Sequence, residues 1–543
     1  MNNTKYLFVV GGVMSSVGKG IASASIGKIL QSRGFSVSII KCDMYVNIDA
    51  GTMRPTEHGE VFVGDDGIEA DQDLGTYERF VDQISTRNHY ITTGQVYQEV
   101  IRRERNLEYK GEDVEVVPDI PNEILRRINL VVKKEKSDFV IVEIGGTVGE
   151  YQNVLFLEAA RMMKFKHKND VLFVLVSYLP IPPMVGEMKS KPTQYAARTL
   201  NSAGIQADFI ICRSERSLDH KRRDKIATFC NVNAENAISA PDVSSVYDVP
   251  VNFIKEKLDE KILKAFGIKP KSRDMKEWRA LAKKIKRLKR EVKIAVVGKY
   301  FGTGDFELAD SYISVIEAAK HAAWGQNVKP NFTWVDSEEY EKDPKKVKEL
   351  SAFDGVIVPG GFGTRGIEGI ISAIKHVRTN TIPYLGLCYG MQLATIEFAR
   401  NVAKIKGATS TEQNPEAKHQ VIHIMPDQEK KLLAKDYGAS MRLGSWPCKL
   451  KKGTKAQKAY AKSRVDERHR HRYEFNNAYR KRLEASGLVV SGVSPDNHIV
   501  EIIELPKHPF FVGVQFHPEF KSRPHKPHPL FKEFVRASLK KRK

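Results

Sequence analysis

The stretch Pro383–Gln392, with the sequence PYLGLCYGMQ, decides the fold of the second half of the chain. An apolar run leads into Cys388, which stands between Gly386 and Gly390, and a helix-like run from Met391 to Ala399 follows. A nucleophile between glycines at a strand-to-helix turn is typical of a nucleophile elbow, where the tight turn exposes the reactive atom. The N–H groups that open the helix would favour the thiolate.

A partner for this thiol is offered far downstream, in the stretch VQFHPE at 514–519. His517 can take the thiol proton, and Glu519 can orient the imidazole ring. The alternative interpretation is a small buried cysteine and an unrelated surface histidine. The two glycines and the His-Pro-Glu triplet favour the catalytic interpretation.

The pairing of Cys388 with His517 and Glu519 resembles that of the class I glutamine amidotransferases. In that family, Cys, His and Glu hydrolyse glutamine to glutamate and ammonia. The stretch PGGFG at 359–363 fits the same family, in which backbone N–H groups after a strand stabilise the tetrahedral intermediate.

Length and composition narrow the class of protein. A chain of 543 residues is too long for one core, so two or more domains are expected. No apolar run is long enough to span a bilayer, and the N-terminus leads into a strand rather than a signal peptide. The five cysteines show neither a disulfide framework nor zinc spacing. We therefore expect a cytoplasmic protein without a membrane partner.

The net charge of +21 has two interpretations. One is nucleic-acid binding, and the other is a surface that attracts small polyanions such as nucleotides. Much of the charge lies in the stretch 269–290 and at the C-terminus, rather than on a helix with base-reading side chains. The pattern favours nucleotides over nucleic acid, and 269–290 is interpreted as a solvated linker helix.

The first half begins with the pattern of a phosphate-binding unit. The run Tyr6–Val10 is typical of a buried parallel strand, and it opens into GGVMSSVGKG at 11–20 before a helix to about Arg33. Loop N–H groups, the helix N-terminus and Lys19 can cradle phosphates. Gly20 replaces the Ser or Thr of the strict Walker A pattern, so a metal would depend on carboxylates. An ordinary tight turn is the alternative.

Two acids are candidates for such a metal site. Asp73 follows the phosphate loop in an acid-rich stretch, and Glu143 ends the apolar run Phe139–Val142. A carboxylate at the C-terminal end of a parallel strand faces the ligand crevice of a doubly wound sheet. Hard oxygen ligands suit Mg²⁺, so Asp73 and Glu143 are predicted to bind it.

These motifs, together with those at 51–63, 73–80, 143–150 and 187–194, occur in the order found in the CTP synthase family, which the chain resembles from about residue 4 to about 535. The alternation of strands and helices predicts an α/β fold. The resemblance implies two domains, each a mostly parallel sheet flanked by helices. It places a synthetase domain at 1–268, a basic linker at 269–291 and a glutaminase domain at 292–543.

The family resemblance implies amination of UTP to CTP, driven by ATP, with ammonia from glutamine and a phosphorylated UTP intermediate. It also implies Mg²⁺, product inhibition by CTP, activation by GTP through the loop at 427–444, and a homotetramer that can form filaments. Two other hypotheses remain: an amidoligase with another acceptor, such as a cobyrinate-type substrate, and a non-catalytic scaffold.

The resemblance also assigns residues to each ligand. For ATP these are Ser16, Val17, Gly18, Lys19, Gly20, Ile21, Lys41, Asp73 and Asp242. For UTP or CTP they are Ser15, Glu150, Tyr151, Gln152, Lys189, Ser190, Lys191, Pro192, Thr193, Gln194 and Lys225. For glutamine they are Gly361, Tyr389, Gly390, Met391, Gln392, Glu412 and Arg472, with Arg470 as the alternative to Arg472.

Overall fold

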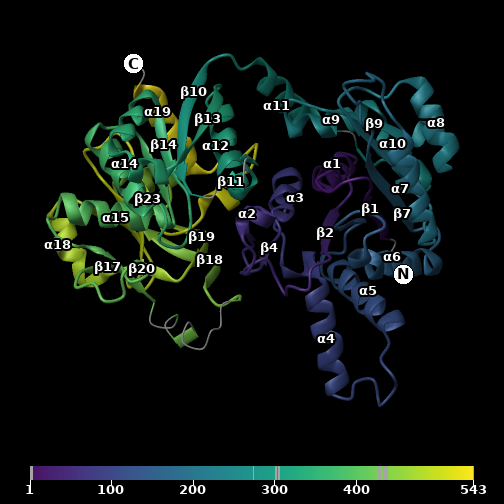
Figure 1. Ribbon diagram of the computed structural model, residues 1–543, viewed down its shortest axis with the longest axis horizontal. Helices are drawn as coiled ribbons and strands as arrows, with labels where there is room; N and C mark the ends of the chain where they lie inside the picture. The colour runs from purple at the N-terminus through teal and green to yellow at the C-terminus, as the bar shows by residue number, and fades with distance from the viewer. Residues whose placement is uncertain are drawn as a thin grey trace. The chain divides into compact units, whose positions relative to one another are not determined.

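The computed structural model describes residues 4–272, 274–299, 302–303, 306–307, 309–425, 428, 430–431 and 438–541. These residues form two compact units (Figure 1). The first holds the described residues up to Asp49 together with Asp73–Lys286, and the second holds Ala50–Gln72 and the described residues from Arg287 onward. Part of the expected loop 427–444 lies outside the described residues, at 427, 429 and 432–437.

The first unit is built on a parallel seven-stranded sheet with the order β5-β2-β6-β1-β7-β8-β9. Its strands are β1 Lys5–Gly11, β2 Val37–Asp43, β5 Tyr90–Thr92, β6 Phe139–Ile144, β7 Val171–Tyr178, β8 Phe209–Ser214 and β9 Ala237–Pro241. They are rich in Val, Ile and Phe because helices cover both faces of the sheet. All of its strand pairs run parallel, so the carboxyl ends of the strands share one edge.

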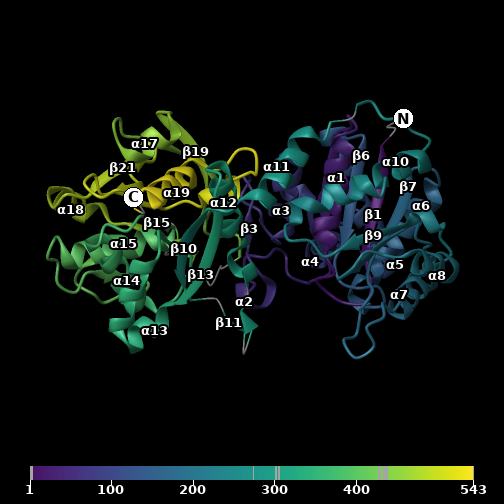
Figure 2. The same cartoon turned by 90° about the horizontal axis from the view of Figure 1, so that it is seen from above.

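Helices of the first unit cover both faces of its sheet. Side chains of Phe8, Ile40 and Val142 pack against one group of helices, and Ile39 and Ile141 face Gly27 of α1 on the opposite side. The helices are α1 Lys19–Gln31, α3 Asp73–Val81, α4 Thr93–Arg105, α5 Val116–Glu135, α6 Val154–Lys166, α7 Lys191–Ser202, α8 His220–Cys230, α9 Val249–Lys255 and α10 Leu258–Ala265. Figure 2 shows α1 and α3 on the same side of β1 and β6.

The expected linker helix is α11, Lys276–Arg287. It is not solvated all round, because Trp278 is buried and donates from Nε1 to the carbonyl of Tyr247 at 2.9 Å. The Trp278 ring also lies beside Phe80, with centroids 5.2 Å apart. The prediction of a solvated linker was therefore wrong for its apolar side, which packs on the first unit, while several of its lysines stay exposed.

The second unit has a nine-stranded sheet with the order β13-β10-β14-β15-β23-β22-β21-β18-β19. Its strands are β10 Glu291–Gly298, β13 Lys329–Asp336, β14 Gly355–Val358, β15 Tyr384–Leu387, β18 Arg442–Leu450, β19 Arg464–His471, β21 Val489–Val493, β22 Val500–Glu504 and β23 Phe511–Val514. Pairing is parallel from β13 to β23 and antiparallel beyond it. The α/β class is confirmed, and this second sheet is mixed.

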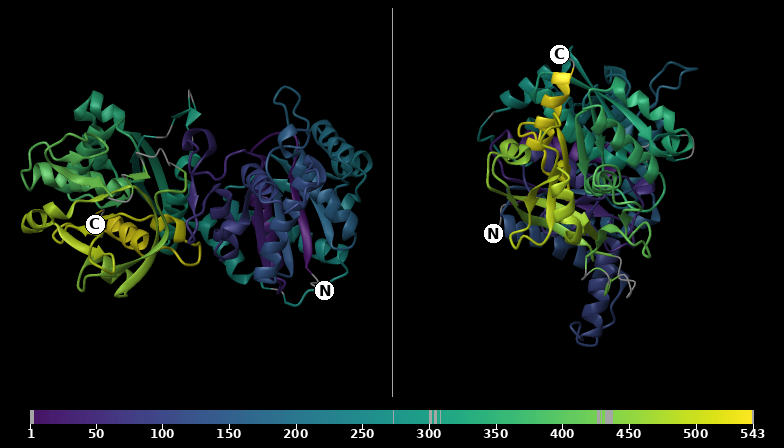
Figure 3. Two further views of the ribbon diagram at one scale, coloured as in Figure 1. Left: turned by 90° about the horizontal axis from the view of Figure 1, so that it is seen from below. Right: turned by 90° about the vertical axis from the view of Figure 1, so that its left-hand side faces the viewer.

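Alternate residues of these strands face opposite layers. Val296 and Leu385 pack with α12 and α19, whereas Val297 and Tyr384 pack with α14 and α15. The described helices of the unit from Arg287 onward include α12 Ile313–Gly325, α13 Ser337–Lys342, α14 Ile367–Thr379, α15 Tyr389–Asn401, α17 Lys455–Tyr460, α18 Arg480–Ala485 and α19 Pro529–Lys541. A small sheet of β16 Thr409–Ser410, β17 Gln420–Ile424 and β20 Tyr473–Phe475 lies apart from the large one. The C-terminal helix α19 is the yellow helix of Figure 3.

The segment Ala50–Gln72 belongs to the second unit, although it precedes most of the first in the sequence. It contains α2 Pro55–His58 and a hairpin of β3 Phe62–Val63 and β4 Glu69–Ala70. Phe62 is fully buried, edge-on to Phe520 at 5.1 Å. The functional boundaries at 268 and 291 stay a prediction, but the packing of this segment was not foreseen.

Candidate active sites

Cys388 occupies a strained turn between β15 and α15. Its backbone angles are φ 48° and ψ −96°, a conformation that side chains other than glycine rarely adopt. The turn is held by the Cys388 amide, which donates to Val514 at 2.7 Å. A Cβ atom on Gly390 would lie 2.4 Å from the carbonyl oxygen of Val358, so glycine is required there. The predicted nucleophile elbow is thus present in the backbone.

His517 and Glu519 stand next to each other after β23. The Nδ1 atom of His517 lies 2.7 Å from Oε1 of Glu519, and both side chains are buried. Burial lowers the pKa of His517, but the charges of Glu519 and then Cys388 outweigh it and raise that pKa to about 10. The other ring nitrogen, Nε2, has no well-aligned hydrogen bond among the described residues. That nitrogen is the one available to exchange a proton with the sulfur.

Cys388 and His517 line one cavity of about 500 Å³ in the second unit. Gly360 borders the imidazole so closely that a Cβ there would lie 2.8 Å from His517 Cε1. The other lining residues are Gly51, Thr52, Met53, Pro55, Glu60, Val61, Ser311, Tyr312, Gly361, Phe362, Met441, Arg470, Arg472, Glu519 and Phe520. Its lining is mostly apolar, with charged groups such as Arg470 and Arg472 among it, so the cavity can hold a small substrate against the thiol.

Residues 51–61 of this lining were missed from the sequence. The motif at 51–63 signalled the family, but its place in the sequence, between two phosphate-site motifs, gave it no link to Cys388. In the structure, Arg470 ties this segment to the rest of the second unit by donating to Glu69 at 2.7 Å and to the carbonyl of Gly51 at 3.1 Å.

The residues predicted to bind glutamine divide into two groups. Gly361 and Arg472 line the cavity, as does the alternative Arg470. Arg472 also donates to Gln428 at 3.0 Å. Tyr389, Gly390, Met391, Gln392 and Glu412 do not line it. Met391 is fully buried in the hydrophobic core, and Gln392 donates from Nε2 to the carbonyl of Tyr473 at 3.1 Å.

Glu412 and Tyr389 meet at Gly363, at the end of the glycine loop. The amide of Gly363 donates to Oε1 of Glu412 at 2.8 Å, and the hydroxyl of Tyr389 donates to its carbonyl at 2.8 Å. Burial raises the pKa of Glu412, against the opposing effects of the Gly363 amide and Lys299. Lys299, which the sequence did not assign to glutamine, donates to the same carbonyl at 2.7 Å.

In the first unit, the glycine-rich loop ends at α1. Gly18 precedes the helix with φ 94°, and Lys19 is its first residue. The Lys19 ammonium donates to the carbonyl of Gly146 at 2.7 Å, at the end of β6. Burial lowers the pKa of Lys19. The loop N–H groups and this lysine therefore lie at the carboxyl edge of the sheet, where a phosphate can bind.

Lys41 and Glu143, which are buried, form a cluster with the partly exposed Asp73 at the same edge. The Lys41 ammonium is bonded to Asp73 and, at 3.0 Å, to Glu143. Tyr77 donates its hydroxyl to the other oxygen of Glu143. Burial raises the pKa of Glu143, against the nearby ammonium groups. The sequence prediction that these groups lie together agrees with this arrangement.

The donor set of this cluster fits a divalent cation. Asp73 presents its carboxylate so close to α1 that a Cβ on Gly20 would lie 1.9 Å from Oδ1. Two carboxylates beside one anion-binding loop are the ligands that Mg²⁺ prefers. The cluster therefore fits the predicted metal.

The remaining nucleotide candidates are spread along the carboxyl edge. Thr193 accepts from Ser177 at 2.8 Å, at the end of β7, and Gln194 donates to Ser190 at 3.0 Å. Asp242 accepts from Arg213 at 2.8 Å. Glu150 accepts from the Thr147 amide at 2.9 Å. Tyr151, Gln152 and Lys225 are exposed, with side chains that the fold leaves in solvent.

Two protein-family models match the chain. Residues 307–537 match the family described as class I glutamine amidotransferase, and residues 5–268 match the family described as CTP synthase N-terminus. A class I glutamine amidotransferase region thus follows, in the sequence, a region typical of CTP synthase N-termini. The chain belongs to the CTP synthase family.

The chain is similar to its relatives along nearly its whole length. The chain is 51% identical over 541 residues to the CTP synthase of Carboxydothermus hydrogenoformans, covering 99% of both chains. It is 51% identical over 537 residues to that of Caldanaerobacter subterraneus, covering 98% of both. Among solved structures, the glutaminase domain of Trypanosoma brucei CTPS with bound acivicin is 40% identical, with a TM-score of 0.43, over 46% of this chain and 94% of that one.

Among the residues that the structure describes, no helix has the length and apolar character needed to cross a membrane.

Proposed function

We propose that this protein is a glutamine-hydrolysing CTP synthase, which aminates UTP with ammonia released from glutamine at the expense of ATP. One observation carries the proposal: Cys388 and the His517–Glu519 pair line a single cavity, in a chain alike over 99% of its length to an enzyme named CTP synthase.

In the second unit, glutamine would bind with its carboxamide against the sulfur of Cys388. The thiol proton passes to Nε2 of His517, the sulfur attacks the carboxamide carbon, and His517 returns the proton to the departing ammonia. Glu519 holds the imidazole ring through Nδ1. Backbone N–H groups of the loop at 359–363 stabilise the oxyanion. Water then hydrolyses the thioester to glutamate.

Other residues of the second unit would position glutamine in that cavity. The backbone around Gly361 and the guanidinium of Arg472 line the space that the substrate occupies. Glu412, held by the Gly363 amide, would accept from the substrate's ammonium group. The cavity would be supported from behind by the backbone at the start of α15, at Tyr389, Gly390, Met391 and Gln392.

In the first unit, ATP would place its phosphates on the loop Ser16–Ile21. Lys19 and Lys41 would stabilise the charge of the phosphoryl group as it moves to O4 of UTP. Mg²⁺, held by Asp73 and Glu143, would supply further positive charge at the phosphate oxygens. Ammonia then displaces phosphate from the phosphorylated UTP. Asp242, which the family resemblance assigns to ATP, directly follows β9 at the same sheet edge.

UTP would bind along Lys189–Gln194, with Ser15, Glu150, Tyr151, Gln152 and Lys225 as further contacts. The lysines suit a triphosphate. Because CTP carries the same triphosphate, we propose that it competes with UTP. We also propose GTP as an activator, a homotetramer as the assembled form, and the cytoplasm as the compartment.

The test is direct. Purified protein should convert UTP, ATP and glutamine to CTP, glutamate, ADP and phosphate when Mg²⁺ is supplied. ATP hydrolysis should depend on UTP, which separates this activity from that of an amidoligase with another acceptor. If the rate of ATP hydrolysis did not depend on UTP, the proposal would be rejected.

A further inference from the structure

Among the described residues, the sulfur of Cys388 has two hydrogen-bonding neighbours besides the imidazole. It lies 3.7 Å from the carbonyl oxygen of Arg470 and 3.6 Å from Nε2 of Gln515. The carbonyl can only accept, so it suits a thiol that donates its proton. The amide nitrogen can only donate, so it suits a sulfur that accepts. The Arg470 carbonyl therefore favours the thiol, and the Gln515 amide favours the thiolate.

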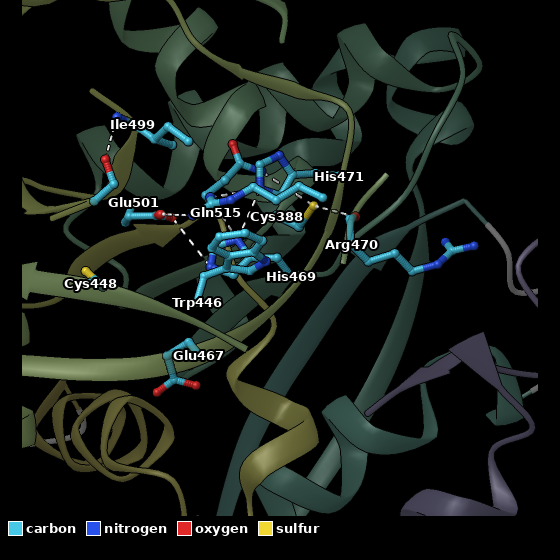
Figure 4. Close-up of polar contacts among 12 residues, drawn as sticks. Cys388, Trp446, Cys448, Glu467, His469, Arg470, His471, Ile499, Glu501 and Gln515 are labelled. Carbon is cyan, nitrogen blue, oxygen red and sulfur yellow. Dashed lines mark hydrogen bonds and ion pairs between the residues drawn. The ribbon is translucent and has the colours of Figure 1, made fainter. Parts of the chain in front are cut away.

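The amide of Gln515 is fixed so that its nitrogen faces the sulfur. Its side chain is fully buried, and its oxygen accepts from Nε2 of Gln392 at 3.4 Å. Gln392 is itself held by the carbonyl of Tyr473. The backbone amide of Gln515 donates to the carbonyl of Glu501 at 2.8 Å. Figure 4 shows Gln515 between Cys388 and the strand that carries Glu501. Because the orientation of this donor is already fixed, little free energy is spent on reorienting it when the thiolate forms.

The nearby histidines of β19 cannot supply the same stabilisation by charge. Burial lowers the pKa of His469 and of His471 well below its ordinary value, and the charge of Arg442 lowers both further. Arg442 donates to Glu501 at 2.8 Å and lies 3.3 Å from Nδ1 of His469. These two imidazoles are thus neutral parts of a buried polar cluster that fixes the strand.

The arginines beside the cavity are also engaged elsewhere. Figure 4 shows the Arg470 side chain pointing away from Cys388, and its guanidinium pairs with Glu69. Arg472 donates to Gln428. Of the titratable groups that face the sulfur, His517 is thus the one whose pKa is raised, to about 10, through Glu519. The neutral amide of Gln515 is the remaining donor in contact with the sulfur.

We propose that Gln515 is a catalytic residue that stabilises the Cys388 thiolate by donating an N–H hydrogen bond to it. As the S–H bond breaks, the proton moves to Nε2 of His517, and the sulfur exchanges the Arg470 carbonyl for the Gln515 amide. The amide keeps both its protons throughout. The same donor stabilises the sulfur again when water expels it from the thioester. This inference rests on the proposed role of Cys388.

The experiment measures the rate of Cys388 alkylation by iodoacetamide against pH, in the full-length protein without glutamine. Gln515→Met keeps the volume and removes the donor, and Gln515→Glu keeps the acceptor for Gln392 while removing the donor. Gln457→Met, in α17 and outside the cavity, is the matched control. Urea unfolding reports on folding of the second unit in each variant, and ammonia-dependent CTP formation shows that the first unit stays active.

Gln515→Met should raise the pH of half-maximal alkylation by about one unit, because it removes a hydrogen bond to the charged form. Its kcat for glutamine hydrolysis should fall about tenfold, with KM within about twofold. Gln515→Glu should shift the midpoint further, since it also adds a negative charge, and it decides the matter if the methionine variant fails to fold. If the pH of half-maximal alkylation is unchanged in either folded variant, the inference about Gln515 is overturned, while the proposed function still stands. A wild-type Cys388 that alkylates without loss of glutamine hydrolysis overturns the proposed function and the inference with it.

Discussion

The ammonium group of Lys299 donates a hydrogen bond of 2.7 Å to the carbonyl oxygen of Gly363, and so ties the end of β10 to the glycine loop beside Cys388. The same ammonium lies 4.7 Å from the centre of the Tyr389 ring. Since the amide of Gly363 also holds Glu412, this lysine supports two parts of the proposed glutamine site from one side.

Replacing Lys299 with Met should therefore weaken glutamine binding. A hydrogen bond from a charged donor is worth about 1.5–3 kcal/mol, so the KM for glutamine should rise by about tenfold or more. Steady-state glutaminase assays measure this, with ammonia-dependent CTP formation as the control for the first unit. An unchanged KM would show that the loop keeps its shape without the lysine.

The ionisation of Lys299 adds a pH dependence with a definite sign. Burial lowers its pKa to about 8, against the opposing charge of Glu412. Between about pH 8 and 10.5 the unfolded chain binds this proton while the folded chain does not, so this group makes the free energy of unfolding rise with pH there. Denaturant unfolding of wild type and Lys299→Met should differ in slope within that window. Parallel pH profiles would contradict the assignment.

Glu519→Gln should remove the charge that keeps the His517 pKa high. The imidazole would then be less well oriented, and glutaminase kcat should fall by about 100-fold. A raised folded-state pKa stabilises the fold fully below about 6.5, and that stability is lost as pH rises toward 10. Wild type should therefore lose more stability than the variant between pH 6.5 and 10, as urea titrations can measure. A similar loss in both proteins would count against the Glu519–His517 coupling.

Cys388→Ala should abolish CTP formation from glutamine while ammonia still supports it. The reason is that the thiol and the phosphate loop belong to different compact units. Both activities are measured by the formation of CTP from UTP and ATP, with either nitrogen source. Equal loss of the two activities would show that the thiol, or the turn that carries it, serves the synthetase reaction as well.

Lys41→Met should give the complementary result. It leaves Asp73 and Glu143 without their shared ammonium, so the first unit should lose more than about 100-fold of its ATP-dependent activity with either nitrogen source. Basal glutamine hydrolysis should persist. Lys225→Met, which changes an exposed lysine, serves as a comparison. It should raise the KM for UTP without a comparable loss of ATP-dependent activity. Retained phosphoryl transfer in Lys41→Met would remove this lysine from the proposed ATP site.

The sequence predicted those parts of the sites that depend on local patterns. Cys388 between two glycines specifies its own turn, because Gly390 must pass Val358 without a side chain. Asp73 was proposed from an acid-rich stretch after the phosphate loop and Glu143 from the end of an apolar run, and both lie beside Lys41 in the structure. The pairing of Cys388 with His517 was inferred from motif chemistry, and the parallel pairing of β15 with β23 is what brings the two residues close.

What the sequence could not reveal depends on packing between distant segments. Gln515 is an ordinary residue of a strand until Gln392 fixes its amide beside the sulfur. Lys299 similarly gains a role only through a loop more than sixty residues away. The antiparallel half of the second sheet also escaped prediction, because its strands carry alternating polar residues that composition alone does not separate from loops.

The placement of Ala50–Gln72 has a practical consequence for dissecting the enzyme. A protein cut at residue 292 would keep the thiol and imidazole but lose the floor formed by Gly51 and Val61. Arg468, whose side chain is fully buried, would lose its ion pair with Asp65 and its contact with the Phe62 ring. Kinetic constants measured on such a fragment would describe a cavity that lacks part of its lining. Fusing residues 50–72 back to the fragment through a short linker would restore that lining.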